Sequence, residues 1–156
     1  MGLLWVMAVA GCGSSTPAST SGSERLTVSY RGVSMSPPLG WEAVKEQLPL
    51  CGAPPGDRTV YIAIAPSPTT ACVVKQSSLR FVYLVCPKTT DTPAVGTPTT
   101  VISGLQASVQ DAGSSSGRLL VWLPTGYPRI FINVPGDPVL ASQIVASIRP
   151  SGSERC

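Results

Sequence analysis

Hydrophobic and polar residues alternate in several short stretches of this chain. Leu26, Val28 and Tyr30 alternate with polar neighbours, Gly32 allows a turn, and the alternation resumes at Val33. A period of two is the pattern of a half-buried strand. The start of the folded region therefore predicts two short strands separated by a turn.

Further apolar stretches predict more strands, with clusters of Pro, Gly and Ser between them. These stretches are residues 59–65, 72–75, 79–86, 100–110, 118–123 and 129–134. The small polar residues at 113–117 predict a hairpin loop. Residues 42–48, with the sequence EAVKEQL, instead predict about two turns of helix that end at Pro49.

Near the C-terminus the apolar spacing lengthens. Leu140, Ile144 and Ile148 recur at i, i+4 and i+8, which predicts an amphipathic helix. Asp137 stands at the expected N-cap, ahead of a proline in the first helical position, and Pro150 follows the last turn. One such helix after a run of strands predicts an α+β domain, with the C-terminal helix packed on one face of an antiparallel sheet.

The first residues of the chain follow another pattern. Residues 3–10 are an apolar run of about eight positions, far short of the roughly 20 that span a bilayer. The run has the length of a signal-peptide core and ends in small residues. The next residues, Val9-Ala10-Gly11-Cys12, resemble the lipobox of bacterial lipoproteins, in which a peptidase cuts before the cysteine and acyl chains are attached to it. Unlike most signal peptides, the run has no Lys or Arg before it.

These patterns divide the chain into three parts. Residues 1–11 are the predicted signal peptide, residues 12–25 hold the lipidated Cys12 and a flexible linker, and residues 26–156 form a single globular domain. The linker is rich in Ser, Thr and Gly, so it cannot bury apolar surface and should remain disordered, spanning roughly 20 Å. We expect the protein at the cell membrane, lipid-anchored, on the extracytoplasmic face.

Once Cys12 is assigned to the lipid, four cysteines remain, which allow three disulfide pairings. Cys51–Cys72 would close a loop of about 20 residues and contribute roughly 3 kcal/mol. It leaves Cys86–Cys156, which would tie the C-terminus to the sheet, and we favour this pairing. The alternative joins Cys72 to Cys86 across a hairpin and leaves Cys51 with Cys156.

Composition narrows the function classes. Lys and Arg number 11 against 8 Asp and Glu, and the basic residues are scattered singly, which argues against nucleic-acid binding. The chain has no histidine, which excludes Ser-His-Asp and Cys-His relays, and no CxxC pair, which disfavours a metal site. We therefore expect no metal, no cofactor and no enzymatic activity.

Two small groups of residues are candidates for function. Glu42 and Glu46 would share one face of the predicted short helix, and such a carboxylate pair could serve a glycosidase. Lys45 beside them favours a solvated face instead. Trp122 and Tyr127 flank a Pro-Thr-Gly turn, where exposed aromatic residues would suit sugar or peptide recognition. Buried aromatic residues that end a hairpin are the alternative.

Three stretches resemble known proteins. YRGVSMSPPLGW, at residues 30–41, resembles the opening of domains in the Mog1/PsbP-like superfamily. LASQIVASIRP, at residues 140–150, resembles the closing helix of small actinobacterial lipoproteins. The spacing of Trp41, Cys51 and Cys72 is similar to a pattern among exported actinobacterial proteins of unknown function. The resemblance implies a curved antiparallel sheet flanked by helices, a core position for Trp41, and no active site.

Together these features predict a non-enzymatic binding or accessory module of the cell envelope. Its partners would be the membrane, through the lipid anchor, and an envelope protein or polymer. One alternative is a carboxylate-dependent envelope hydrolase, which needs a pocket with two facing carboxylates. Another is a structural subunit of a membrane complex, which needs an apolar patch of several hundred Å².

Overall fold

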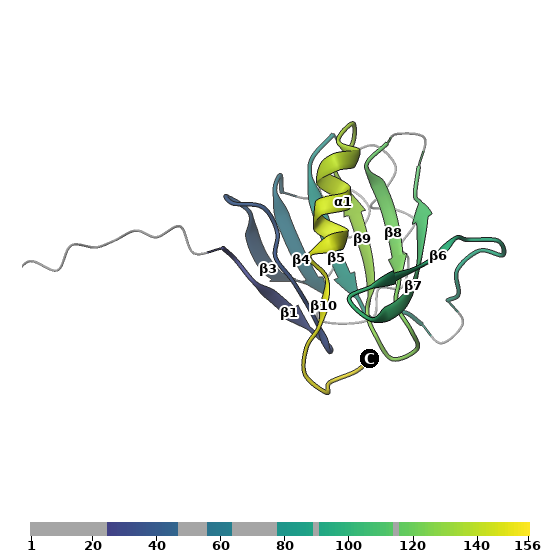
Figure 1. The fold of residues 1–156 in the computed structure, drawn as a ribbon. Coiled ribbons are helices and arrows are strands. Elements are labelled where there is room, and N and C mark those ends of the chain that lie inside the picture. The colour runs from purple at the N-terminus through teal and green to yellow at the C-terminus, as the bar shows by residue number, and fades with distance from the viewer. Residues whose placement is uncertain (1–24, 47–55, 64–77, 89–90, 114–115) are drawn as a thin grey trace, which may run out of the picture.

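A computed structural model describes residues 25–46, 56–63, 78–88, 91–113 and 116–156. These ranges form ten strands and one helix (Figure 1). The strands are β1 (Val28–Tyr30), β2 (Val33–Met35), β3 (Glu42–Glu46), β4 (Thr59–Ala63), β5 (Phe81–Val85), β6 (Thr99–Ile102), β7 (Leu105–Asp111), β8 (Arg118–Trp122), β9 (Arg129–Asn133) and β10 (Arg149–Pro150). The helix is α1 (Pro138–Ala146).

The strands build two sheets. The smaller has the order β1-β2-β10, and the larger has the order β3-β4-β5-β9-β8-β7-β6. In the larger sheet β3, β4 and β5 are parallel to one another, and the remaining neighbours are antiparallel. The carboxyl ends of the three parallel strands therefore lie at the same edge of the sheet, next to the C-terminus (Figure 1).

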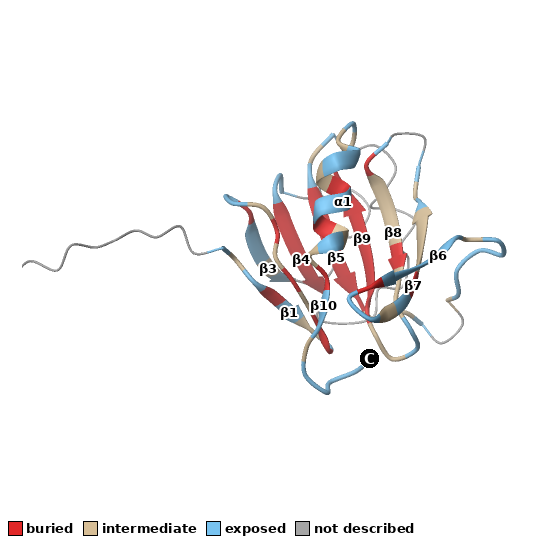
Figure 2. Ribbon diagram, in the orientation of Figure 1, coloured by how far each residue is buried: buried red, intermediate tan, exposed pale blue. Residues whose placement is uncertain are grey.

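The centre of the larger sheet is buried on both faces (Figure 2). Every residue of β4, β5 and β9 is buried, and successive residues point to opposite faces. One face carries an aliphatic core that includes Val60, Ile62, Val82, Leu84, Ile130 and Ile132. The other carries an aromatic cluster of Tyr61, Phe81, Tyr83 and Phe131. Burial on both faces explains why the central residues of these strands are apolar without interruption.

The smaller sheet and α1 cover the aliphatic core. Val33 and Met35 of β2 and Ala141 and Ile144 of α1 belong to the same buried cluster as the central strands, as does Trp41. The turn between β6 and β7 reaches the end of the helix, where the Ser103 hydroxyl donates to the Ile148 carbonyl over 2.8 Å.

The predicted α+β architecture, with a curved antiparallel sheet, is wrong. The described residues are mostly β, in sheets of three and seven strands with a single short helix. The larger sheet is mixed, because β3, β4 and β5 are parallel.

The helix predicted at residues 42–48 is a strand, β3, over its described residues. All five positions of β3 pair with β4, from Glu42 opposite Thr59 to Glu46 opposite Ala63, and Val44 packs against the aromatic cluster. Two turns of isolated helix are marginal in water, so pairing with the sheet decides the conformation.

The stretch predicted as one strand at residues 100–110 forms two. Ser103 and Gly104 have φ angles of 50° and 84°, and Ile102 pairs with Leu105 across them. Two positive φ angles in succession are typical of a two-residue hairpin turn. The predicted strand at 72–75 lies outside the described residues.

The C-terminal helix begins as its sequence predicts and ends earlier. The Asp137 carboxylate accepts the backbone N–H of Leu140 over 2.9 Å, and Pro138 opens the helix. The helix ends at Ala146, and Arg149 pairs with Ser34 of β2 instead of forming the last helical turn.

Candidate functional site

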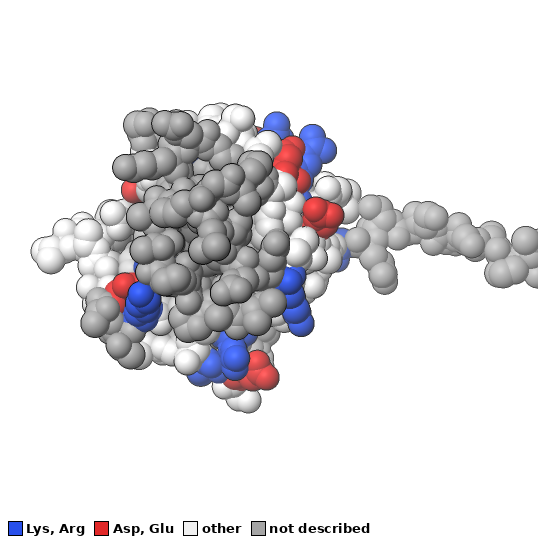
Figure 3. Space-filling view, turned by 180° about the vertical axis from the view of Figure 1, so that it is seen from behind, with Lys and Arg blue, Asp and Glu red and all other residues white. Residues whose placement is uncertain are grey.

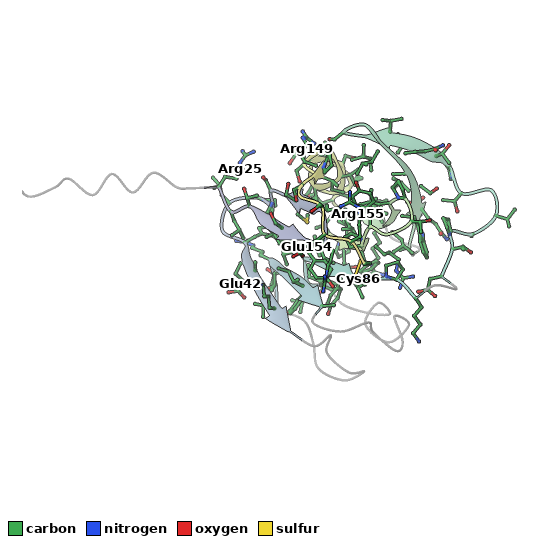
Figure 4. All side chains as sticks on the ribbon, turned by 90° about the horizontal axis from the view of Figure 1, so that it is seen from below. Arg25, Glu42, Cys86, Arg149, Glu154 and Arg155 are labelled. Atoms are coloured by element: carbon green, nitrogen blue, oxygen red, sulfur yellow. A yellow bond between two sulfur atoms is a disulfide. The ribbon has the colours of Figure 1, made fainter. Side chains whose placement is uncertain are left out.

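The last six residues, 151–156, cross the end of the domain where the parallel strands finish; we call them the strap. The Ser151 N–H donates to the Gly32 carbonyl over 2.8 Å, and the Cys156 N–H donates to the Gly126 carbonyl over 2.7 Å. A disulfide joins Cys156 to Cys86, which follows β5 directly, with the two Cα atoms 5.4 Å apart (Figure 4). The strap is therefore fixed to three separate parts of the chain.

Arg155, next to the end of the strap, attaches it to the turn between β8 and β9. Its guanidinium lies 4.1 Å from the centre of the Tyr127 ring, and its Nη2 donates to the Tyr127 hydroxyl over 2.9 Å. On the other side lies Gly32, where a Cβ atom would come within 2.5 Å of the Glu154 carbonyl oxygen and closer still to Arg155. Gly32 thus combines a positive φ of 78° with a close approach of the strap.

A groove of about 510 Å³ opens beside the strap, and we call it the strap groove. Its walls are the strap, the turn between β1 and β2, and the carboxyl ends of β3 and β4. The charged residues among its described lining are Arg31, Lys45 and Glu154. Arg31 and Glu154 approach to 4.0 Å, with their side chains 48% and 77% exposed. An ion pair with both side chains this exposed contributes little stability. The Arg31 guanidinium and the Glu154 carboxylate can therefore both contact a ligand.

Tyr30 connects the strap groove to the disulfide. Its hydroxyl donates to the Ala63 carbonyl over 2.9 Å and lies 3.5 Å from the Cys86 sulfur. This contact joins the smaller sheet to the end of β4 and to β5. Crevices at the carboxyl ends of parallel strands are frequent ligand sites in open sheets.

The turn beside this groove is strained. Arg31 has a φ of 43° and Gly32 a φ of 78°, and Tyr30 pairs with Val33 across them. Asn or Gly usually occupies the first of these positions, and a left-handed backbone costs a residue with a Cβ atom roughly 1–2 kcal/mol. Arg58 and Ser103 also have positive φ among the described residues, and Arg31 is the member of this group that lines the strap groove.

The predicted recognition residues contact other parts of the protein. Trp122 is half-buried at the end of β8, with the Arg129 guanidinium 4.8 Å from its ring centre. Arg129 also pairs with Asp91 at 3.1 Å. Tyr127 is half-buried, and its ring contacts the Arg155 guanidinium. Neither aromatic residue is among the described residues that line the strap groove.

The helical turn that would have placed Glu42 beside Glu46 is not formed. Glu42 and Glu46 lie four positions apart on a strand, so their backbones are about 13 Å apart rather than one helical turn. A glycosidase needs its carboxyl groups within roughly 5 to 10 Å. The Glu42 carboxylate instead accepts the Thr59 hydroxyl over 3.2 Å.

Of the predicted cysteine roles, the structure describes one pair. The Cys86–Cys156 disulfide is present, and it belongs to the favoured pairing. Cys12, Cys51 and Cys72 lie outside the described residues.

Within the described ranges, no cluster of three or more His, Cys, Asp or Glu side chains could hold a metal ion. No helix in the described part of the chain is long and apolar enough to cross a membrane.

The face behind α1 shows no concentration of one charge sign among its described residues. Figure 3 shows Lys and Arg interspersed with Asp and Glu on that side. A mixed distribution does not favour attraction to a strongly charged polymer there.

Sequence reasoning missed Arg31, Glu154 and Arg155 as a group, since they come from opposite ends of the chain. The one local signal was Arg-Gly between two alternating stretches, which places an arginine in a turn that favours asparagine. Comparison with protein-family models, with curated proteins and with solved structures gives no match to this chain.

Proposed function

We propose that this chain is a lipid-anchored extracytoplasmic protein and a non-enzymatic binding or accessory module of the cell envelope, with the strap groove as its binding site. The lipobox-like residues before Cys12 and the Ser/Thr-rich linker after it support the anchor. The partner is an envelope protein or polymer.

The Cys86–Cys156 disulfide is the observation that carries the proposal. Disulfides persist in oxidising compartments and are rare in the cytosol. This one also fixes the strap, which forms one wall of the groove. The bond thus favours an oxidising compartment and holds one wall of the groove in place; the anchor rests on the sequence around Cys12.

The chemistry of the groove favours a polar ligand that carries an acidic group. Among the described residues that line it, Arg31 and Lys45 supply two positive charges and Glu154 supplies one negative charge. Arginine can bind a carboxylate or phosphate through two parallel hydrogen bonds. A segment of an envelope protein or an acidic polymer of the cell wall has this chemistry.

The two alternatives have less support. The carboxylate-dependent hydrolase is expected on a helix that places Glu42 and Glu46 one turn apart, and these residues lie on a strand instead. A structural subunit needs a broad apolar surface. The exposed large hydrophobic residues of the described chain instead come from four different segments, at Leu39, Val95, Val101 and Val139.

Cross-linking on native membranes tests the binding role. A photoreactive residue in place of Ser29, an exposed position in the strap groove, should give a discrete cross-linked partner. The same residue in place of Val139, which is 65% exposed on α1 and does not line the strap groove, is the control. Identical products from both positions, or none from Ser29, would contradict the proposal.

A further inference from the structure

A second groove, of about 700 Å³, lies where the described chain begins, and we call it the tether groove. Its walls are Arg25, the loop at residues 36–39 and the C-terminal half of α1 with Arg149. None of the described residues that line it is acidic. Two arginines therefore set its charge.

Both arginines have donors to offer a ligand. Arg149 uses only its Nη1, which donates to the Ser103 hydroxyl over 2.7 Å and to the carbonyls of Ile148 and Ala146. Its Nε and Nη2 have no hydrogen bond to a described residue. Arg25 is exposed and has no ion pair or hydrogen bond within the described chain. The full charge of Arg149 also outweighs the partial negative charge at the end of α1.

An exposed apolar side chain lies beside these cations. Leu39 is 58% exposed, while Pro37 before it is buried. Of the exposed large hydrophobic residues in the described chain, Leu39 is the one that lines either the strap groove or the tether groove. Cations next to a projecting apolar group are the combination found on surfaces that lie at a membrane interface.

We propose that the tether groove docks the domain onto anionic phospholipid, with Arg25 and Arg149 against the headgroup phosphates and Leu39 at the acyl boundary. This inference rests on the proposed anchor at Cys12. Arg25 directly follows the linker, whose expected span is roughly 20 Å, so the groove is the part of the domain nearest to the anchor along the chain.

The interaction between the tether groove and the bilayer can be weak, and most molecules can still be docked. Each arginine near an anionic surface adds roughly fivefold in affinity, or about 30-fold for the two. A short tether keeps the domain at a high effective concentration near the bilayer. Docking and anchoring therefore reinforce one another.

Docking would also orient the strap groove away from the bilayer. Arg25 and Arg149 lie along one edge of Figure 4, and Glu154, Arg155 and Cys86 lie toward its middle. From Arg25 of the tether groove to Ser29 of the strap groove the extended chain covers about 13 Å, and Arg149 and Ser151 line the two grooves on either side of Pro150. A partner could then reach the strap groove while the domain stays docked.

Hydroxyl-radical oxidation of the lipidated full chain tests this inference. The chain is reconstituted in vesicles of phosphatidylcholine alone, or of phosphatidylcholine mixed with phosphatidylglycerol. We expect Leu39 to be oxidised several-fold more slowly on the anionic vesicles, and this protection to disappear at high salt. Val95, which is fully exposed in the loop before β6, is the internal control. That loop lies across the domain from the start of the described chain (Figure 1). The oxidation rate of Val95 should therefore be the same on both kinds of vesicle.

Two matched variants test whether Arg25 contributes to the docking. Arg25→Gln should restore most of the oxidation of Leu39 on anionic vesicles, whereas Arg80→Gln, with the same loss of charge at another exposed arginine, should not. Equal effects of the two variants would overturn the assignment to this groove. Protection of Leu39 by soluble glycerol phosphate without vesicles would also overturn it, in favour of a free-anion site.

The result separates docking from anchoring. A chain that floats with both kinds of vesicle, but whose Leu39 is oxidised equally on both, contradicts docking alone. A chain that floats with neither contradicts the anchor at Cys12 and the docking with it.

Discussion

The Arg155 guanidinium lies 4.1 Å from the centre of the Tyr127 ring and donates a hydrogen bond of 2.9 Å to its hydroxyl. Through this contact the strap is attached to the turn between β8 and β9, and Cys156 attaches it a second time to the end of β5. An aromatic residue that the sequence offers for recognition of a partner instead fixes one wall of the strap groove.

Removal of the disulfide should destabilise the domain. Cys156→Ser removes a covalent bond between residues 70 positions apart. We therefore expect the free energy of unfolding to fall by about 2–4 kcal/mol. Urea titration measures the change. Cys86→Ser should cost the same, and the double variant no more than either, because all three lack one bond. A double variant that is clearly less stable than either single variant would contradict this account.

Relief of the strain at Arg31 should raise the stability of the domain and weaken its binding of a partner. Arg31→Asn places a residue that tolerates positive φ where φ is 43°, so we expect the unfolding free energy to rise by up to about 1 kcal/mol. Cross-linking from position 29 should weaken in the same variant, because the groove loses a cation. Arg80→Asn is the control, since Arg80 is exposed and does not have positive φ. Equal stabilisation by both variants would show that backbone strain is not the cause.

The helix should contribute to the core through one face. Ile144 is 1% exposed and packs in the aliphatic core, so Ile144→Ala should cost about 2–5 kcal/mol. Gln143 beside it is exposed, and Gln143→Ala should change stability by less than about 0.5 kcal/mol. Unchanged urea midpoints for both variants would mean that α1 does not belong to the core.

The sequence predicts best where local signals agree. Asp137 followed by Pro138 marks the start of α1, and the alternation around Gly32 marks β1 and β2. The apolar stretches at 79–86 and 129–134 become β5 and β9. In each case capping, turn chemistry and apolar period favour the same element.

Strand pairing between segments that are far apart in the sequence cannot be predicted from either segment alone. Residues 42–46 have helical spacing, yet they form a strand because β4 offers a partner along its whole length. Parallel order cannot be deduced from any single stretch, so the mixed sheet was unforeseen. The strap groove was missed for the same reason, since Arg31 and Glu154 meet only in the folded chain.

Lipid labelling tests the proposed location most directly. Cells that express the chain are fed a clickable palmitate analogue, and the purified protein is examined for incorporated label. We predict label on the wild-type chain at Cys12, none on Cys12→Ser, and release of the Cys12→Ser domain from the membrane fraction. An unlabelled wild-type chain, or a Cys12→Ser chain that keeps its label, would contradict the lipid anchor on which the proposed function depends.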